Sequence, residues 1–497
     1  MKRLICLVAV VLLVGESVYA GKILTGVRVS YNLTQEQIRF VNEHFDFVMT
    51  PFLSHEVRNA IQKPKLLLYR SIQGTWTDFD QFDWQHINSH ENMFCHSDSA
   101  NQSPDTRILT RWNSWLMDGN DLVDSTAADA LNHWVNYYAV TASEQVHAFD
   151  YDGLFIDSAG HRLGRGAVYG VMPWDYSPDT WRDGRYAALR FIKAYLPDKT
   201  VIFNGLHSDN GADSSLSLTD GGMWEDFAFS ADDGSYKGEE KWWEAIRCLD
   251  SNKDRARLVL VVKKPGLMTD LQARIFSVAS YLLVCNENVV LSLSDYAHNT
   301  SLQYYPEYEI SLGDPLGDFS VNGDSLCVRA FENGLVAVNA SSSVTRTLDL
   351  GGQTWFKVVP TGGGFVDASG DWDGSLSYEE VSGNVAIPPV SALILRHDLA
   401  TDVAEPHAPL PDFELEQNFP NPFNPSTTIR YRLSKPGHVV LNVYDSAGRK
   451  VRTLVDQRQR AGSYSVEFTG PDLPTGTYYC TLRTGAIQST RKMLLLK

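Results

Sequence analysis

Two hydrophobic patterns alternate along most of the chain. Short apolar runs, typical of buried parallel strands, recur between residues 26 and 294 and are separated by stretches with helical spacing of apolar residues. Strands are predicted at residues 27–32, 45–51, 65–71, 153–157, 201–205, 222–226, 258–263 and 289–294. Helices are predicted at residues 34–44, 125–147, 178–195, 238–250 and 269–284. This alternation indicates a parallel α/β architecture.

Eight strand-like segments are enough to close a (β/α)8 barrel, also called a TIM barrel. The competing architecture, an open doubly wound sheet, requires a glycine-rich phosphate loop after its first strand. Residues 32–34, Asn-Leu-Thr, do not provide one. We therefore expect an α/β fold with a (β/α)8 catalytic barrel over residues 21–318.

After the barrel the pattern changes to short β signals. Residues 319–399 contain several of them and are predicted to form an accessory β-sandwich. Residues 400–412 hold three prolines and are predicted to be a linker. Over residues 413–497, alternating strands with glycine turns predict an immunoglobulin-like β-sandwich.

The N-terminus has the pattern of a secretory signal peptide. Lys2 and Arg3 precede an apolar stretch, and Val18-Tyr19-Ala20 has the small-x-small pattern of a cleavage site. Residues 1–20 are therefore predicted to be removed on export. No segment reaches the roughly 18 apolar residues of a membrane span, so no transmembrane span is predicted.

Charge and cysteine content narrow the function. The net charge of −17, with no basic stripe, argues against nucleic acid and favours a soluble protein that acts on neutral or cationic material. The cysteines beyond the signal peptide match neither a disulfide-rich scaffold nor a zinc site, although one disulfide within the barrel is compatible with their number. They are Cys95, Cys248, Cys285, Cys327 and Cys480.

Residues 369–374, with Glu380, resemble a calcium loop in which serine replaces the first aspartate. A hairpin turn explains the same residues more simply. We therefore predict no metal and no cofactor, with calcium at this loop as the weaker alternative.

Polar residues end three successive barrel strands. Asp157 ends the fourth in YDGLFIDS, Asn204 ends the fifth in VIFNGL, and Glu225 ends the sixth in GGMWEDF. Residues at the C-terminal ends of barrel strands point into the active-site mouth. A strand-ending Asp can also cap the next turn, and Asn204 can serve the turn at Gly205.

Glycoside hydrolysis requires two carboxyl groups beside the scissile bond, one charged and one protonated. Burial beside Trp224 would favour the protonated form of Glu225, whereas hydrogen bonds could keep Asp157 ionised. Asp226 is the alternative acid if the strand register differs by one residue, because successive side chains face opposite sides. We favour Asp157 and Glu225 as the catalytic pair.

Further residues at strand ends and in long loops are candidates for substrate binding. The loops at residues 76–124 and 160–177 are rich in aromatic residues and are expected to shape the barrel mouth, although such rings also hold loops together. The substrate-binding candidates are Tyr31, Arg70, Trp112, Asn204, His207, Trp224, Asp226 and Lys263.

The motifs YDGLFIDS, VIFNGL and GGMWEDF, with RWNSWLMDGND before them, resemble the hypothetical glycosyl hydrolase-like families of bacterial secreted proteins. The resemblance covers about residues 26–397. It implies retaining hydrolysis of α-linked sugars, with Asp157 as nucleophile and Glu225 as acid/base.

The string NFPNPFNPSTTI in the C-terminal part resembles the sorting domain of the type IX secretion system. The resemblance implies a partner in the secretion machinery and a location outside the cell or on the outer-membrane surface.

The sequence thus predicts a secreted or cell-surface glycoside hydrolase that cleaves a polysaccharide or oligosaccharide. HExxH, GxSxG and Walker patterns are absent, which disfavours metalloprotease, esterase and nucleotide-hydrolase chemistry. The alternative is a non-catalytic carbohydrate-binding or adhesion protein on the same scaffold.

Overall fold

The computed structural model describes residues 22–497 except 30–31, 78–81, 207–210, 324, 398–412, 416, 419, 434–436, 447, 460–461, 485–486 and 497. The chain divides into two compact units, Met1–Asp398 and Leu399–Lys497. The predicted signal peptide and the predicted linker lie outside the described residues.

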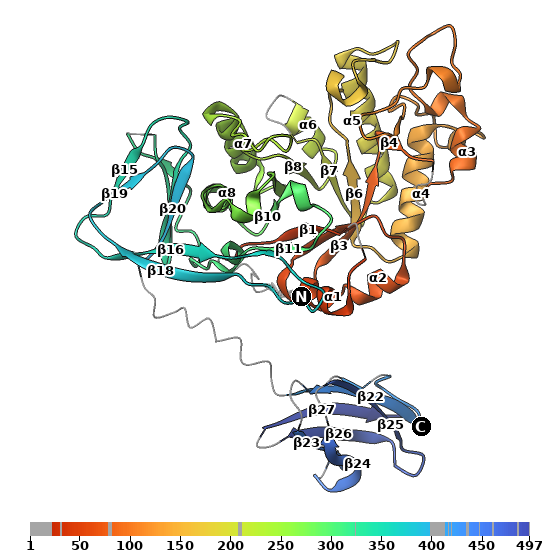
Figure 1. Cartoon of the computed structure of the whole chain (residues 1–497). Coiled ribbons are helices and arrows are strands. Elements are labelled where there is room, and N and C mark those ends of the chain that lie inside the picture. Colours follow the sequence, from red (N-terminus) through yellow and green to blue (C-terminus); the bar gives the residue numbers. More distant parts are fainter. Residues whose placement is uncertain are drawn as a thin grey trace, which may run out of the picture. The chain divides into compact units, whose positions relative to one another are not determined.

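The first unit is built on eight parallel strands, which confirms the predicted barrel (Figure 1). Neighbouring strands in the sheet follow the order of the chain, and a bridge from Thr25 to Leu291 joins the last strand to the segment before the first. The strands are β1 (Gly26–Arg28), β2 (Phe47–Thr50), β3 (Lys65–Ser71), β6 (Gly153–Asp157), β7 (Thr200–Asn204), β8 (Gly221–Trp224), β9 (Arg257–Lys263) and β10 (Val289–Ser294).

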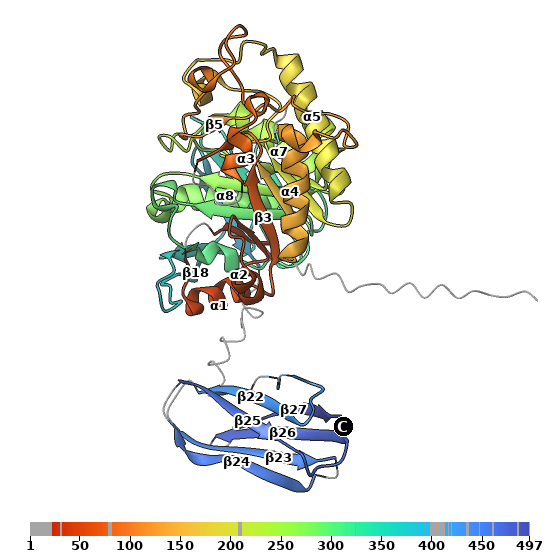
Figure 2. The same ribbon diagram turned by 90° about the vertical axis from the view of Figure 1, so that its right-hand side faces the viewer.

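Helices connect successive strands, as Figures 1 and 2 show. They are α1 (Gln35–His44), α2 (His55–Ala60), α4 (Trp134–Ala148), α5 (Pro178–Tyr195), α6 (Gly211–Leu216), α7 (Glu239–Asn252) and α8 (Leu271–Val284). Helix α5 has the predicted bounds because Ser177 caps its N-terminus and forms a capping box with Thr180. Helix α4 begins at Trp134, nine residues later than predicted from residue 125, because the carboxylate that accepts its first N–H comes from Asp121 (2.7 Å).

Side chains at alternate strand positions fill the interior of the barrel. They are Phe47, Met49, Leu67, Tyr69, Phe155, Ile202, Met223, Val259, Val261 and Val290. The residues between them face outward, and Leu66, Leu68 and Ile156 belong to the larger core that includes the helices. This two-residue period decides which side chains at the strand ends can meet.

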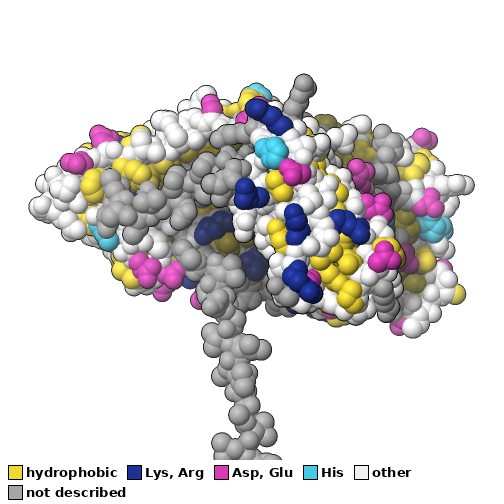
Figure 3. Space-filling view, turned by 90° about the horizontal axis from the view of Figure 1, so that it is seen from below, with side chains coloured by type: hydrophobic (Ala, Val, Ile, Leu, Met, Phe, Trp, Pro, Cys, Tyr) yellow, Lys and Arg dark blue, Asp and Glu magenta, His cyan; other side chains and the backbone are white. Residues whose placement is uncertain are grey.

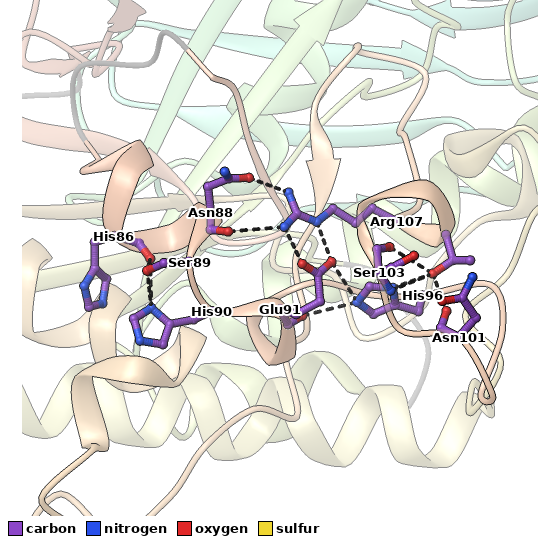
Figure 4. Close-up of polar contacts among 10 residues, drawn as sticks. His86, Asn88, Ser89, His90, Glu91, His96, Asn101, Ser103 and Arg107 are labelled. Carbon is purple, nitrogen blue, oxygen red and sulfur yellow. Dashed lines mark hydrogen bonds and ion pairs between the residues drawn. The ribbon is translucent and has the colours of Figure 1, made fainter.

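The loop between β3 and α4 contains short elements of its own, among them α3 (Trp84–Asn88) and β5 (Trp115–Leu116). Figure 4 shows its polar centre, where Arg107 donates to both carboxylate oxygens of Glu91 at 2.6 Å and to the Asn88 side chain at 2.8 Å. The Arg111 N–H donates to the Ala167 carbonyl at 2.8 Å. The loops that follow β3 and β6 are therefore joined at the same end of the barrel.

A β-rich region follows the barrel within the first unit. Its main sheet has the order β12 (Ser320–Val321), β13 (Cys327–Phe331), β14 (Gly334–Asn339), β20 (Ser391–Arg396), β16 (Trp355–Thr361) and β18 (Ser375–Val381). A pair formed by β15 (Arg346–Asp349) and β19 (Asn384–Ile387) lies apart from this sheet. Strands β14 and β20 pack on helix α8, and Figure 1 labels β20 and α8 in this region.

The second unit consists of two antiparallel sheets around a separate core. One sheet contains β21 (Phe413–Leu415), β22 (Ser426–Leu433) and β25 (Gly462–Thr469). The other contains β24 (Lys450–Gln459), β23 (Gly437–Asp445), β26 (Gly476–Thr484) and β27 (Ile487–Leu495). Leu441, Phe468 and Leu482 are buried in this core.

All five cysteines beyond the signal peptide are buried free thiols, so the disulfide that their number allowed is not formed. In the calcium-like loop, Asp373 accepts a hydrogen bond from the Gly363 N–H at 2.9 Å. In the described part of the chain, no helix combines the length and apolarity needed to cross a bilayer.

Figure 3 shows one face of the molecule, on which Lys and Arg side chains gather near the middle and Asp and Glu side chains are spread around them. The net charge of −17 therefore does not make every surface acidic.

Candidate active site

A cavity of about 270 Å³ lies at the C-terminal ends of the barrel strands. Its charged lining residues are Arg28 at the end of β1, Asp157 at the end of β6, Glu225 just after β8, and Lys263 at the end of β9. Because these strands belong to one barrel, side chains that are distant in sequence converge on a single space.

Asp157 is surrounded by hydrogen-bond donors. The Tyr69 hydroxyl donates to Oδ2, while the Ser158 N–H and the Asn204 amide each donate to Oδ1 at 2.7 Å. Burial, together with the charge of Asp157, raises the pKa of Tyr69 well above its usual range, so this phenol stays protonated and donates. Three donors stabilise the charged form of the carboxylate.

Glu225 also accepts two hydrogen bonds. The Lys263 ammonium donates to Oε1, and the Asn204 amide donates to Oε2 at 2.9 Å. Burial lowers the pKa of Lys263, but the charge of Glu225 and the hydrogen bond to it outweigh burial, and the pKa is raised. The lysine is therefore charged near neutral pH and forms an ion pair with Glu225.

Asn204 joins the two carboxylates through a single nitrogen. Because that nitrogen lies 2.7 Å from an Asp157 oxygen and 2.9 Å from a Glu225 oxygen, the two oxygens are less than about 6 Å apart. Gly205 follows with a φ of 131° and packs against Gly160, where a Cβ would approach to 2.5 Å. The backbone turn at Gly205 therefore directly follows the Asn204 amide that bridges the two carboxylates.

Arg28 and Tyr69 line the cavity although neither was among the sequence candidates. The Arg28 guanidinium carbon lies 4.0 Å from the centre of the Tyr69 ring. Tyr69 pairs with Phe155 in the sheet and so shares the inward direction of Asp157, a register that the sequence did not reveal.

Arg70 and Asp226 occupy the positions next to these inward residues, and neither lines the cavity. Arg70 is fully buried behind the barrel, where it donates to Thr141 Oγ1 at 3.1 Å and stacks on Phe82 and Tyr138. Burial, and then the charge of Glu225, raises the pKa of Asp226.

The two tryptophan candidates also lie outside the cavity lining. Trp224 is buried in the core that includes the helices. Trp112 is 47% exposed in the loop after β3. Tyr31 and His207 fall outside the described residues. Of the predicted site residues, the structure thus brings together Asp157, Asn204, Glu225 and Lys263.

Among the described residues, no group of three or more His, Cys, Asp or Glu side chains is placed to hold a metal ion. The charged groups available in the cavity are two carboxylates and two cations, and the Tyr69 and Tyr296 phenols lie beside them.

Two family models match the chain. The hypothetical glycosyl hydrolase family 15 model matches residues 73–335, just over half of the chain. The secretion system C-terminal sorting domain model matches residues 417–496. No curated protein matches the chain.

Similar solved structures include the glycoside hydrolase domain of PelA from Pseudomonas aeruginosa, with 14% identity and a TM-score of 0.37, covering 55% of this chain and 96% of that one. An Anoxybacillus α-amylase has 11% identity and a TM-score of 0.37, covering 74% and 90%. The type III pullulan hydrolase from Thermococcus kodakarensis has 10% identity and a TM-score of 0.38, covering 75% of each chain. Likenesses at this level do not bear on the substrate.

Proposed function

The chain belongs to the hypothetical glycosyl hydrolase family 15, and from this premise we propose that its barrel hydrolyses glycosidic bonds of a polysaccharide or oligosaccharide. The sorting domain makes the protein a secreted or cell-surface protein. The proposed substrate is therefore a carbohydrate that the protein meets outside the cell.

The observation that carries this proposal is that Asp157 and Glu225 line one cavity and both accept a hydrogen bond from Asn204. In the proposed reaction, Asp157 attacks the anomeric carbon while Glu225 protonates the departing oxygen. Glu225 then takes a proton from the water that releases the sugar from Asp157. Oxygens closer than about 6 Å favour this double displacement, because retaining enzymes hold the carboxyls roughly 5–5.5 Å apart and inverting enzymes roughly 6.5–9.5 Å.

The hydrogen bonds of the two carboxylates support the same roles, with Asp157 as the nucleophile and Glu225 as the acid. Asp157 accepts from Tyr69, Ser158 and Asn204, which suits a nucleophile that must remain charged. Glu225 must gain a proton before it can act as an acid, and its hydrogen-bond partner is the Lys263 ammonium. Preference for an α-linkage rests on the resemblance of the strand motifs.

A polymeric substrate is supported by exposed aromatic rings at this end of the barrel. Trp112 is 47% exposed, Tyr169 is 70% exposed and Trp174 is 52% exposed. The Tyr169 hydroxyl donates to the Arg111 carbonyl at 3.4 Å, which places rings from both loops in one region. Such rings offer flat apolar faces on which sugar units can stack.

The test is a hydrolysis screen of the full chain against a glycan panel, with Asp157→Asn and Glu225→Gln as variants. We expect each variant to lose activity by about 10²–10⁴-fold, because each removes one half of the acid–nucleophile pair. Asp226→Asn is the matched control, since that neighbouring carboxylate lies outside the cavity lining. Proton NMR of the first product gives the anomeric configuration, and retention is expected.

The alternative is a non-catalytic carbohydrate-binding protein. It is favoured by the ion pair between Lys263 and Glu225, which occupies the carboxyl group that would have to act as the acid. Wild-type protein that binds glycans but cleaves none of the panel would establish this alternative. Activity unchanged in both Asp157→Asn and Glu225→Gln would reject the assigned pair.

A further inference from the structure

The cavity is lined by two cations, Arg28 and Lys263, and by two carboxylates, Asp157 and Glu225. Lys263 forms an ion pair with Glu225. Arg28 is solvent-exposed on the cavity wall and stacks on Tyr69, and it forms no hydrogen bond or ion pair with the residues that the structure describes. A fixed guanidinium with free N–H groups is suited to bind a planar anion through two parallel hydrogen bonds.

The charge balance changes when Glu225 becomes an acid. Proton transfer to the leaving oxygen requires a protonated Glu225, and Asp157 is then the remaining anion among the charged lining residues. Arg28 stays positive, because a guanidinium does not lose its proton in proteins. The pKa of Lys263 is raised mainly by the charge of Glu225 and the hydrogen bond to it, whereas burial lowers it. When Glu225 is protonated, Lys263 has lost its main anionic partner, and a second anion in the cavity would keep its ammonium charged.

We propose that the sugar unit bound in this cavity carries a carboxylate, as uronic acids do, and that Arg28 and Lys263 bind this group. The inference rests on the proposed hydrolase function and adds the substrate class. The incoming carboxylate replaces Glu225 as the partner of Lys263, and Glu225 takes a proton from solvent. An anionic substrate therefore prepares the acid that cleaves it.

The position of Arg28 is consistent with this role. Its guanidinium stacks on the ring whose hydroxyl donates to Asp157, so a carboxylate held by Arg28 lies near the nucleophile. The overall charge of −17 does not oppose it, since the local field in a cavity is set by the nearest charges.

Equilibrium binding tests the inference separately from turnover. Isothermal titration of the full chain with paired sugars compares glucuronate with glucose, galacturonate with galactose, and mannuronate with mannose. We expect at least one uronate to bind about tenfold or more tightly than its neutral partner, which is the range of a charge-assisted hydrogen-bond pair. High salt should reduce the preference.

Arg28→Met should make the affinity for the uronate similar to the affinity for its neutral partner sugar. Arg28→Lys should restore part of the difference between these two affinities. Arg247→Met is the matched control, because that arginine is also exposed and stacks on a ring, Trp243, at 5.2 Å on helix α7. Thermal unfolding of each variant reports whether the barrel has kept its fold.

The inference is overturned if no uronate binds more tightly than its neutral partner, including the case in which none binds. It is also overturned if Arg28→Met weakens uronate and neutral sugar equally in a folded protein. Selective uronate binding without any hydrolysis would instead reject the proposed activity and leave the carboxylate site. Hydrolysis restricted to neutral glycans would reject the carboxylate site and leave the proposed hydrolase activity.

Discussion

At the scale of single residues, Asn204 connects the two carboxylates that line the cavity. It donates to both carboxylates, while Tyr69 and Lys263 each donate to one of them. Asn204 and Lys263 could be predicted from the sequence because they end apolar strands. Tyr69 could not be distinguished from Arg70 by composition, because either residue suits a strand end and the barrel register alone decides which one faces inward.

Replacing Lys263 should change the pH dependence of hydrolysis. The raised pKa of Lys263 keeps its ammonium charged through neutral pH, where it favours the ionised form of Glu225. Lys263→Met removes that charge, so Glu225 retains its proton to higher pH. The limb of the pH–rate profile that reports loss of the acid should therefore move to higher pH.

The measurement is kcat/KM against pH for wild type and for Lys263→Met, with Lys264→Met as control. Lys264 is the next residue and pairs with Asp270 at 3.0 Å instead of Glu225. An unchanged profile in Lys263→Met would contradict the assignment of Glu225 as the acid beside this lysine.

At the scale of elements, strands β3, β6 and β10 and helix α5 have the predicted bounds. Their signals are local, since apolar runs, proline at a helix start and a capping serine act within a few residues. Helix α4 shows where local reasoning fails, because the carboxylate at its start belongs to Asp121, thirteen residues before the amide it accepts from.

A buried ion pair gives a prediction for helix α8. Arg274 and Glu307 are both 0% exposed, and Arg274 Nε donates to Glu307 Oε1 at 2.6 Å. Glu307→Gln leaves the guanidinium buried without its counter-ion, and we expect a loss of about 3–5 kcal/mol in the free energy of unfolding. Urea unfolding of the first unit, followed by circular dichroism, measures it.

The double variant Arg274→Met with Glu307→Leu provides the control for this pair. Because both charges are removed together, it should cost less than the sum of the two single changes. Equal additive losses would show that the two side chains act independently.

At the scale of the whole molecule, the barrel and the β-rich region after it share one continuous core, to which Phe276 of α8 and Val336 of β14 both belong. The C-terminal unit has its own core around Leu441 and Leu482. Folding of the site should therefore depend on the first unit alone, and export on the second.

A chain that ends at residue 398 tests this separation. Purified from the cytoplasm of a heterologous host, it should keep kcat/KM within about twofold of the full chain, as expected for units with separate cores. Expressed in a bacterium with the matching secretion system, it should remain inside the cell envelope while the full chain reaches the surface or medium. Immunoblots of cell fractions measure the second outcome. Surface display of the shortened chain would argue against the sorting role.

The sequence by itself determined the eight-strand barrel, the strand ends that carry Asp157, Asn204 and Glu225, and the export signal in the tail, because each is written in short, contiguous patterns. Only the tertiary structure decided that Glu225 and not Asp226 faces Asp157, that Tyr69 and not Arg70 enters the cavity, and that Arg28 lies beside them. The physical reason is register: alternate side chains of a strand face opposite sides, and closure of the barrel fixes which side is inside.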